Sequence, residues 1–246
     1  MMEQIRTVAW KEWKALGDQT GIQGLGGIAA ITAIVIAVGV VMPWMAGPEF
    51  FSSPLTLLVY SFTGASVATN PVIDSFAGEK ERRTLETLLS TPLEDRAILL
   101  GKMWVGLAAG WTVPMLLYGL ALATVNFKVR GSGLVWPPNW AVVGVPGVTA
   151  AAVGLVCSTG ILASMRCSTV RQAAQVFGYA AVGLFLAPAI LVTLLPGGFK
   201  ATIAEWLAQQ DPVTLVLIGV GVLLAVDVIC LWLAFIAFRR GRLAPE

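Results

Sequence analysis

The chain has 246 residues, of which 57% are hydrophobic and 12% are charged, and its mean hydropathy is +0.81. Because soluble domains carry roughly 25% charged residues, this composition excludes a water-soluble fold and requires a lipid environment. The net charge of +2 is too small to indicate nucleic-acid binding, and the absence of histidine excludes Ser-His, Cys-His and His-metal chemistry, so we expect no catalytic residue and no metal site.

Residues 1–20 predict an amphipathic helix that lies in the membrane interface. Apolar residues recur at helical spacing at Ile5, Ala9, Trp13 and Leu16. The basic residues of the segment occupy its other faces. A helix of this kind lies flat on the bilayer, with its tryptophan rings at the level of the lipid headgroups. Membrane lipid is therefore an expected partner.

Six apolar segments are each long enough to span a membrane, because about 20 residues at 1.5 Å per residue cover roughly 30 Å of hydrocarbon. They comprise residues 25–45, 54–76, 97–127, 141–165, 172–195 and 213–238. Pro71 predicts a kink in the second span. The expected fold class is an all-α integral membrane protein with six transmembrane helices in one domain, residues 1–246.

The distribution of basic residues predicts the orientation of the chain. If the N-terminus faces the cytoplasm, only Lys128, Arg130 and Lys200 of the sixteen Lys and Arg residues fall in outside loops. Cytoplasmic loops of membrane proteins carry an excess of basic residues. Both termini are therefore expected on the cytoplasmic side of the inner (cytoplasmic) membrane.

The loop between the second and third spans predicts a short cytoplasmic helix over residues 79–90. Gly78 is expected to end the second span, and strong helix formers begin at Glu79. An apolar stripe follows at Leu85, Leu88 and Leu89. Two interpretations follow: the helix is a solvated connector, or its leucine stripe docks in a groove of a cytoplasmic protein.

Small residues in the third and fourth spans are spaced to let helices approach closely. They are Gly106, Gly110, Ala150, Gly154 and Ser158. Between the fifth and sixth spans, residues 199–210 predict a short amphipathic helix on the outer face. Its apolar residues are Phe199, Ile203, Trp206 and Leu207, between Pro-Gly-Gly and Asp-Pro boundaries.

Asp227 is the one acid deep inside a span, near the middle of the sixth. An ionised carboxylate there costs about 2.5–3.5 kcal/mol, so it should face the bundle interior, a partner or water. Two interpretations stay open. Asp227 lies on a translocation pathway, or it is protonated or hydrogen-bonded and holds neighbouring helices together.

The segment after the second span resembles the corresponding loop of type-2 ATP-binding-cassette (ABC-2) exporter permeases. The matching residues are Glu79-Lys80-Glu81-Arg82, Thr84-Leu85-Glu86, Leu88-Leu89, Ser90-Thr91-Pro92 and Gly101-Lys102. Many relatives have glycine where Arg83 stands here. The layout of an interfacial helix, six spans and an outer helix before the last span is also similar.

This resemblance implies that the loop is a coupling helix seated in a cleft of a separate ATPase subunit. The docking residues it implies are Glu79, Glu81, Arg82, Thr84, Leu85, Glu86, Leu88 and Leu89. The chain has no G-x-x-x-x-G-K-[ST] phosphate-binding loop. We therefore expect this chain to bind no cofactor, ATP and Mg²⁺ to be bound by the partner ATPase, and two permease chains, identical or related, to assemble with two ATPase subunits.

Two other classes of protein remain to be weighed against an exporter permease. A stand-alone channel or ion-coupled transporter would use Asp227 as its proton or cation site, but it would have only that one central ionisable residue. An intramembrane enzyme lacks the histidine and the second intramembrane acid that its chemistry needs. The sequence does not identify the transported substrate.

Overall fold

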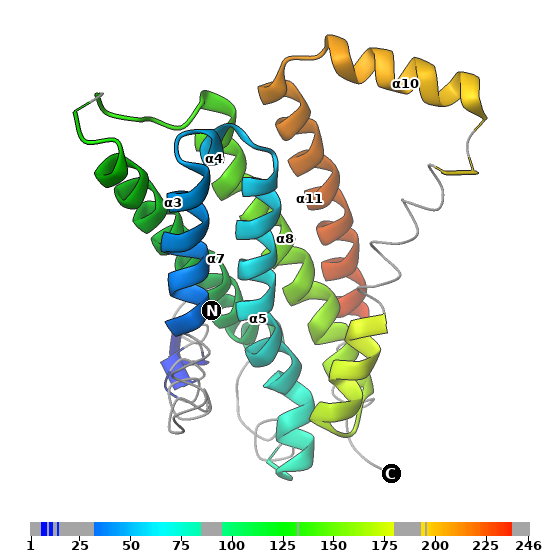
Figure 1. The fold of residues 1–246 in the computed structure, drawn as a ribbon. Coiled ribbons are helices and arrows are strands. Elements are labelled where there is room, and N and C mark those ends of the chain that lie inside the picture. Colours follow the sequence, from blue (N-terminus) through cyan, green and yellow to red (C-terminus); the bar gives the residue numbers. More distant parts are fainter. Residues whose placement is uncertain are drawn as a thin grey trace.

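The computed structural model describes residues 6–8, 10–11, 14, 32–84, 95–131, 133–179, 193–194 and 196–237. Regular structure in these ranges is helical, with no strand among them. The labelled elements are the π-helical segment η1 (Ala37–Val41) and the helices α3 (Met42–Ala46), α4 (Glu49–Ser52), α5 (Leu55–Glu81), α7 (Asp95–Lys128), α8 (Asn139–Arg166), α10 (Gly197–Gln209) and α11 (Pro212–Ala237). In Figure 1 the long helices run side by side, and α10 lies across one end of the bundle.

Three helices in the described ranges are long and apolar enough to cross a membrane, namely Ala97–Lys128, Asn139–Arg166 and Pro212–Ile236. They correspond to the predicted third, fourth and sixth spans. A shorter apolar helix, Thr32–Ala46, covers part of the first. The helix α5 is 27 residues long, but its Ser, Thr, Asn and charged side chains lower its hydropathy. Most of the predicted fifth span, 172–195, lies outside the described residues.

Glycines bring α5, α7 and α8 into close contact within the chain. A Cβ atom on Gly64 of α5 would lie 2.5 Å from the carbonyl oxygen of Gly110 of α7. A Cβ atom on Gly106 of α7 would lie 2.6 Å from Cγ2 of Val72. Only glycine allows backbones to approach this closely. The small residues predicted in the third span therefore serve packing inside one chain.

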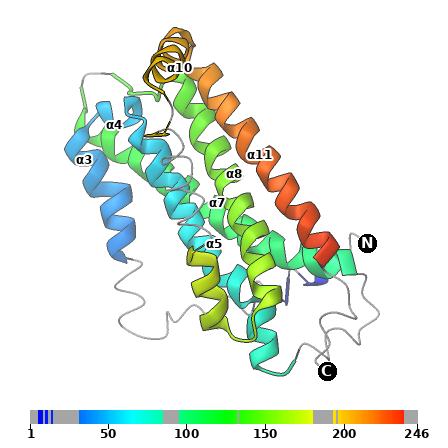
Figure 2. The same ribbon diagram turned by 90° about the vertical axis from the view of Figure 1, so that its right-hand side faces the viewer.

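The two ends of the bundle differ in chemistry. We call one the basic end, which carries Lys11, Lys80, Arg82, Arg83 and Arg166. The other is the aromatic end, where the rings of Phe50, Phe51, Tyr60 and Tyr118 pack edge to face with centroids 5.1 to 6.3 Å apart. Both ribbon views place the C-terminal end of α5 at the opposite end of the bundle from α10 (Figures 1 and 2).

The N-terminal segment is helical where the structure describes it. Val8 is buried, with 4% of its surface exposed, whereas Trp10 is 70% exposed. The predicted apolar face, comprising Ile5, Ala9, Trp13 and Leu16, lies outside the described residues.

Two short helices were predicted outside the spans, and the structure bears on both. The helix α10 confirms that a helix forms within residues 199–210, with its start at Gly197. The expected break at Gly78 is wrong, because α5 continues through Gly78 to Glu81. The first three residues of the predicted helix 79–90 are thus the last turn of α5, and residues 85–90 lie outside the described ranges.

Candidate functional site

The helix α5 ends in a cap that requires a left-handed residue. Arg83 has a φ angle of 56°. Its N–H donates to the carbonyl of Lys80 (3.1 Å), and the N–H of Thr84 donates to the carbonyl of Glu79 (2.9 Å). This pair of hydrogen bonds is the Schellman motif, in which the left-handed position usually holds glycine. The glycine that many ABC-2 permeases have at this position is therefore the residue that the backbone favours.

Glu79 is buried at the basic end and pairs with a lysine of the next helix. Its carboxylate lies 3.1 Å from Nζ of Lys102, whose side chain is 1% exposed, and 3.5 Å from Nζ of Lys11, whose side chain is 62% exposed. Lys102 also donates to the carbonyl of Ser75 (2.7 Å), and its Nζ lies 5.2 Å from the centroid of the Phe76 ring. Paired, hydrogen-bonded charges are the form in which buried ions are tolerated. This pair joins the end of α5 to the start of α7.

The last two residues of α5 join it to the end of α8 and to the helical residues that follow. Nζ of Lys80 donates to the carbonyls of Met165 and Cys167, at 2.5 and 3.2 Å. A carboxylate oxygen of Glu81 accepts the N–H of Val170 (3.1 Å), where the next helix begins. A cation at one helix C-terminus and an anion at the next N-terminus both complement the helix dipoles. Burial lowers the pKa of the Lys80 ammonium, and the neighbouring Cys167 opposes that shift.

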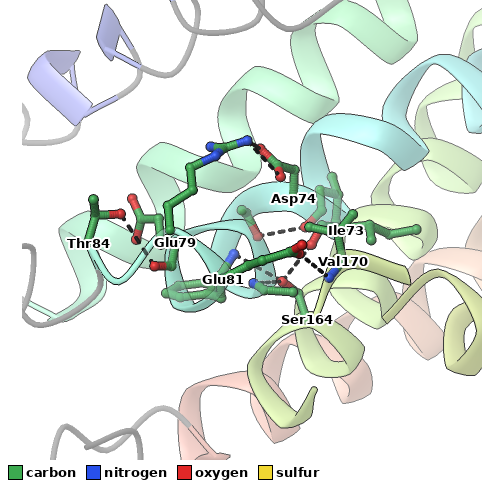
Figure 3. A network of polar contacts seen from close by, with 12 residues as sticks. Ile73, Asp74, Glu79, Glu81, Thr84, Ser164 and Val170 are labelled. Atoms are coloured by element: carbon green, nitrogen blue, oxygen red, sulfur yellow. Dashed lines mark hydrogen bonds and ion pairs between the residues drawn. The ribbon is translucent and has the colours of Figure 1, made fainter. Parts of the chain in front are cut away.

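An ion pair between Asp74 and Arg82 runs over Gly78 on the surface of α5. One guanidinium nitrogen of Arg82 donates to both carboxylate oxygens of Asp74, at 3.1 and 3.2 Å (Figure 3). A Cβ atom on Gly78 would collide with that carboxylate. A hollow of about 260 Å³ opens here, lined by Gly78, Glu81, Arg82 and Val170. Gly78 therefore leaves room for the Asp74 side chain, and α5 continues through Gly78.

Ser164 of α8 holds the last turns of α5 from within the bundle. Its hydroxyl accepts the N–H groups of Phe76 and Ala77, at 3.0 and 2.8 Å, and donates to the carbonyl of Ile73 at 2.8 Å. Figure 3 shows this hydroxyl beside the backbone of α5. Ser164 is fully buried. One donor and two acceptor positions are the whole capacity of a hydroxyl group, so this contact fixes α5 against α8.

The structure describes four of the eight predicted docking residues. They are Glu79, Glu81, Arg82 and Thr84. Glu79 is placed differently from the prediction: its carboxylate is buried among lysines, so it belongs to the junction between helices and not to a docking surface. The other three are exposed. Leu85, Glu86, Leu88 and Leu89 lie outside the described residues.

Sequence reasoning did not identify the partners that hold this junction together. Lys80 and Lys102 enter the sequence analysis only as parts of the loop motif, and Ser164 does not enter it. One signal was available for Lys102. A lysine inside an apolar helix requires a nearby acid or acceptor, and Glu79 lies just across the loop in sequence.

Asp227 lies in the contact between α11 and α8. It is 9% exposed, and a Cβ atom on Gly154 of α8 would lie 2.6 Å from its Oδ2. The side chain of Ser158 lies near the carboxyl group. Oδ1 has no hydrogen-bond partner among the described residues. Gly154, one of the predicted small residues, thus makes space for an acid of a neighbouring helix.

One face of α5 is exposed in the described part of the chain and becomes polar along its length. Near the aromatic end it carries Leu58 and Phe62, which are 64% and 73% exposed. Toward the basic end it carries Ser66 and Asn70, both exposed. Polar side chains on membrane helices avoid lipid and face water, a cavity or a polar partner. The polar half of this face is therefore a candidate lining for a pathway.

A family comparison identifies the chain. The model of the ABC-2 family transporter protein matches residues 59–218, which is more than half of the chain and includes nearly all of α5, the whole of α7 and α8, and the residues that join them. A comparison with curated proteins finds no significant match. The chain belongs to the ABC-2 transporter family and is a membrane-embedded permease component of an ABC-type transporter.

Proposed function

We propose that this chain is the permease subunit of an exporter, driven by a separate ABC ATPase that grips the segment between α5 and α7. The observation that carries the proposal is the buried ion pair between Glu79 and Lys102, which flank that segment. Because this ion pair links α5 to α7, a force on the segment between them moves both helices. The family match supports an ATPase as the partner.

The proposed docking surface combines charged residues at the end of α5 with the leucine stripe. It comprises Glu81, Arg82, Thr84, Leu85, Glu86, Leu88 and Leu89. The leucines supply the apolar contact that fills a groove, and the charges set its orientation. The polar hollow beside Glu81 and Arg82 adds concave surface next to the segment. Glu79 does not contact the ATPase in this arrangement, because its carboxylate pairs with lysines inside the junction.

The proposed cycle places all nucleotide chemistry in the partner. ATP and Mg²⁺ bind to the two ATPase subunits, and their closure on ATP displaces the docking segment. The junction transmits that displacement to α5, α7 and α8, which shifts the helices from an inward-facing to an outward-facing arrangement, and hydrolysis resets them. This assignment follows from the family resemblance together with the ties that join these helices.

Two permease chains, identical or related, enclose the pathway in this proposal. The polar half of the exposed face of α5, with Ser66 and Asn70, lines it. Asp227 holds α11 against α8, since its carboxyl group is buried between those helices. Exposed apolar residues of α11, such as Val228 and Trp232, face lipid or the second chain.

We propose that the basic end faces the cytoplasm and that the chain lies in the inner (cytoplasmic) membrane. The excess of lysine and arginine at this end supports the orientation. It also puts the docking segment on the side where ATP is available. Both termini then lie on the cytoplasmic side, and the N-terminal helix lies in the interface.

Co-purification with an ABC ATPase from the same organism tests the proposal. Changing Leu85 and Leu88 to Asp should abolish complex formation and permease-stimulated ATP hydrolysis while the permease still inserts. Leu134, which is 80% exposed at the aromatic end, provides the matched control. Leu134→Asp should leave the complex intact. An unchanged complex in the double variant would contradict the docking role.

An ion-coupled transporter is the second candidate function. It is favoured by Oδ1 of Asp227, which is buried without a hydrogen-bond partner among the described residues. Vesicles that contain the permease alone would then take up protons under an imposed potential, followed with a trapped pH-sensitive dye. Asp227→Asn would abolish that uptake. Uptake that requires the ATPase and ATP would exclude this function.

A further inference from the structure

We propose that the N-terminal helix takes part in coupling as a support for the end of α5, and that Lys11 is the positioning residue that connects the two through Glu79. This inference rests on the proposed function and extends it to a helix outside the loop motif. The carboxylate of Glu79 is shared by two lysines from different parts of the chain. Oε1 lies 3.1 Å from Nζ of Lys102 in α7 and 3.5 Å from Nζ of Lys11 in the N-terminal helix.

The two lysines differ in how firmly they are held. The Lys102 side chain is 1% exposed and also donates to the carbonyl of Ser75, so it is held by two contacts away from water. The Lys11 side chain is 62% exposed, and its contact is longer. An exposed ion pair is weak and exchanges readily with water. The Lys102 contact is therefore the more firmly held of the two, and the Lys11 contact is the one that can form and break.

The backbone of Glu79 also holds Thr84, a residue of the proposed docking surface. Its carbonyl oxygen accepts the N–H of Thr84 at 2.9 Å and the hydroxyl of Thr84 at 3.4 Å. A displacement of the segment at Thr84 is thus passed to the backbone that carries the Glu79 carboxylate. Glu79 thus connects Thr84 to the bundle and also contacts the N-terminal helix.

The N-terminal helix can resist that displacement because it is held on two sides. Val8 is buried, and Trp10, on another face, is 70% exposed. An exposed tryptophan on an interfacial helix anchors at the lipid headgroups. Lys11 follows directly and reaches Glu79. The bilayer surface therefore serves as the fixed point against which the end of α5 moves.

The test is the ATPase activity of the full complex in lipid nanodiscs, with ATP as the only added substrate. Lys11→Gln should lower kcat about threefold to fivefold and leave KM for ATP unchanged, since an exposed pair contributes little and the nucleotide site is in another chain. Lys11→Arg should restore kcat. Lys14→Gln is the matched control, because Lys14 is also exposed in the same helix and has no ion pair with Glu79. It should behave like the wild type.

A second comparison assigns the effect to Glu79. In a Glu79→Gln, Lys102→Met background, adding Lys11→Gln should cause no further loss of kcat. Equal activity of Lys11→Gln and Lys14→Gln, or a full additional loss in that background, would overturn the inference. These results are separable from failure of the proposed function, in which the wild-type permease binds no ATPase at all.

Discussion

Different kinds of interaction stabilise the two ends of the bundle. The basic end is held by directional contacts, in which Glu79, Lys80, Glu81 and Ser164 each meet a specific charge or backbone group. The aromatic end has some hydrogen bonds, such as the two between the Asn126 side chain and the backbone of Val135, but its core consists of packed rings, and the hydroxyls of Tyr60 and Tyr118 have no hydrogen-bond partner among the described residues. Directional contacts fix distances and angles, whereas ring packing tolerates small shifts. The end that borders the docking segment is thus the end built to transmit movement.

Among substitutions at the two ends, we expect the largest loss of stability from replacing Lys102 at the basic end. Lys102→Met leaves the buried Glu79 carboxylate with the exposed Lys11 as its one remaining cation among the described residues, and an uncompensated buried charge costs about 3–5 kcal/mol. Replacing both residues, as Glu79→Gln with Lys102→Met, should recover most of that loss. Thermal unfolding in detergent measures both variants. Equal stability of the single variant and the wild type would show that the pair is not buried as described.

Removal of the Ser164 hydroxyl should have the next largest effect. Ser164→Ala removes three hydrogen bonds between α8 and the backbone of α5, which should cost about 1–3 kcal/mol. Thr159→Val provides a control in the same helix, because the Thr159 hydroxyl donates to the carbonyls of Leu155 and Val156 within α8. Chemical denaturation should separate the two variants. Similar losses of unfolding free energy in both variants would show that the Ser164 hydroxyl does not stabilise the junction.

Arg83→Gly should stabilise the protein by about 1 kcal/mol, because a left-handed backbone costs a non-glycine residue roughly 1–2 kcal/mol. The gain should appear as a higher midpoint of thermal unfolding. Arg82→Gly, at the neighbouring position with an ordinary right-handed backbone, should instead lower the midpoint. Destabilisation by Arg83→Gly would argue against the left-handed cap.

The smallest effect is expected at the aromatic end. Tyr60→Phe removes a buried hydroxyl that lacks a partner among the described residues, so the free energy of unfolding should not fall and should change by less than about 1 kcal/mol. The ring packing against Phe50 and Tyr118 remains. A clear loss of stability would show that this hydroxyl has a partner and that the aromatic end is also directional.

Local pattern predicted much of the fold, because span length, hydropathy and turn residues are properties of short segments. Thus α10 and the three most apolar spans were expected within a few residues. The break at Gly78 was wrong because glycine disfavours a helix by only about 1 kcal/mol. Here the contacts of Glu79 to Glu81 with α7 and α8 outweigh that preference.

The candidate site was predictable in its location but not in its contacts. The acidic-basic cluster after the second span coincides with the helix junction that the structure shows, and Gly101-Lys102 belongs to the same motif. Which of the charges point inward depends on how α5, α7 and α8 meet in space, and helical spacing alone does not provide that information. Glu79 was therefore grouped with exposed residues, although it is 7% exposed.

The most direct test of the account is photo-crosslinking in the assembled transporter. A photoreactive amino acid at position 88 should crosslink to the ABC ATPase, and the same group at position 134 should not. The account predicts that the crosslink at position 88 depends on ATPase co-expression and disappears in the Leu85→Asp variant. Crosslinks from position 88 to lipid or to the permease alone, in a complex that still hydrolyses ATP, would contradict it.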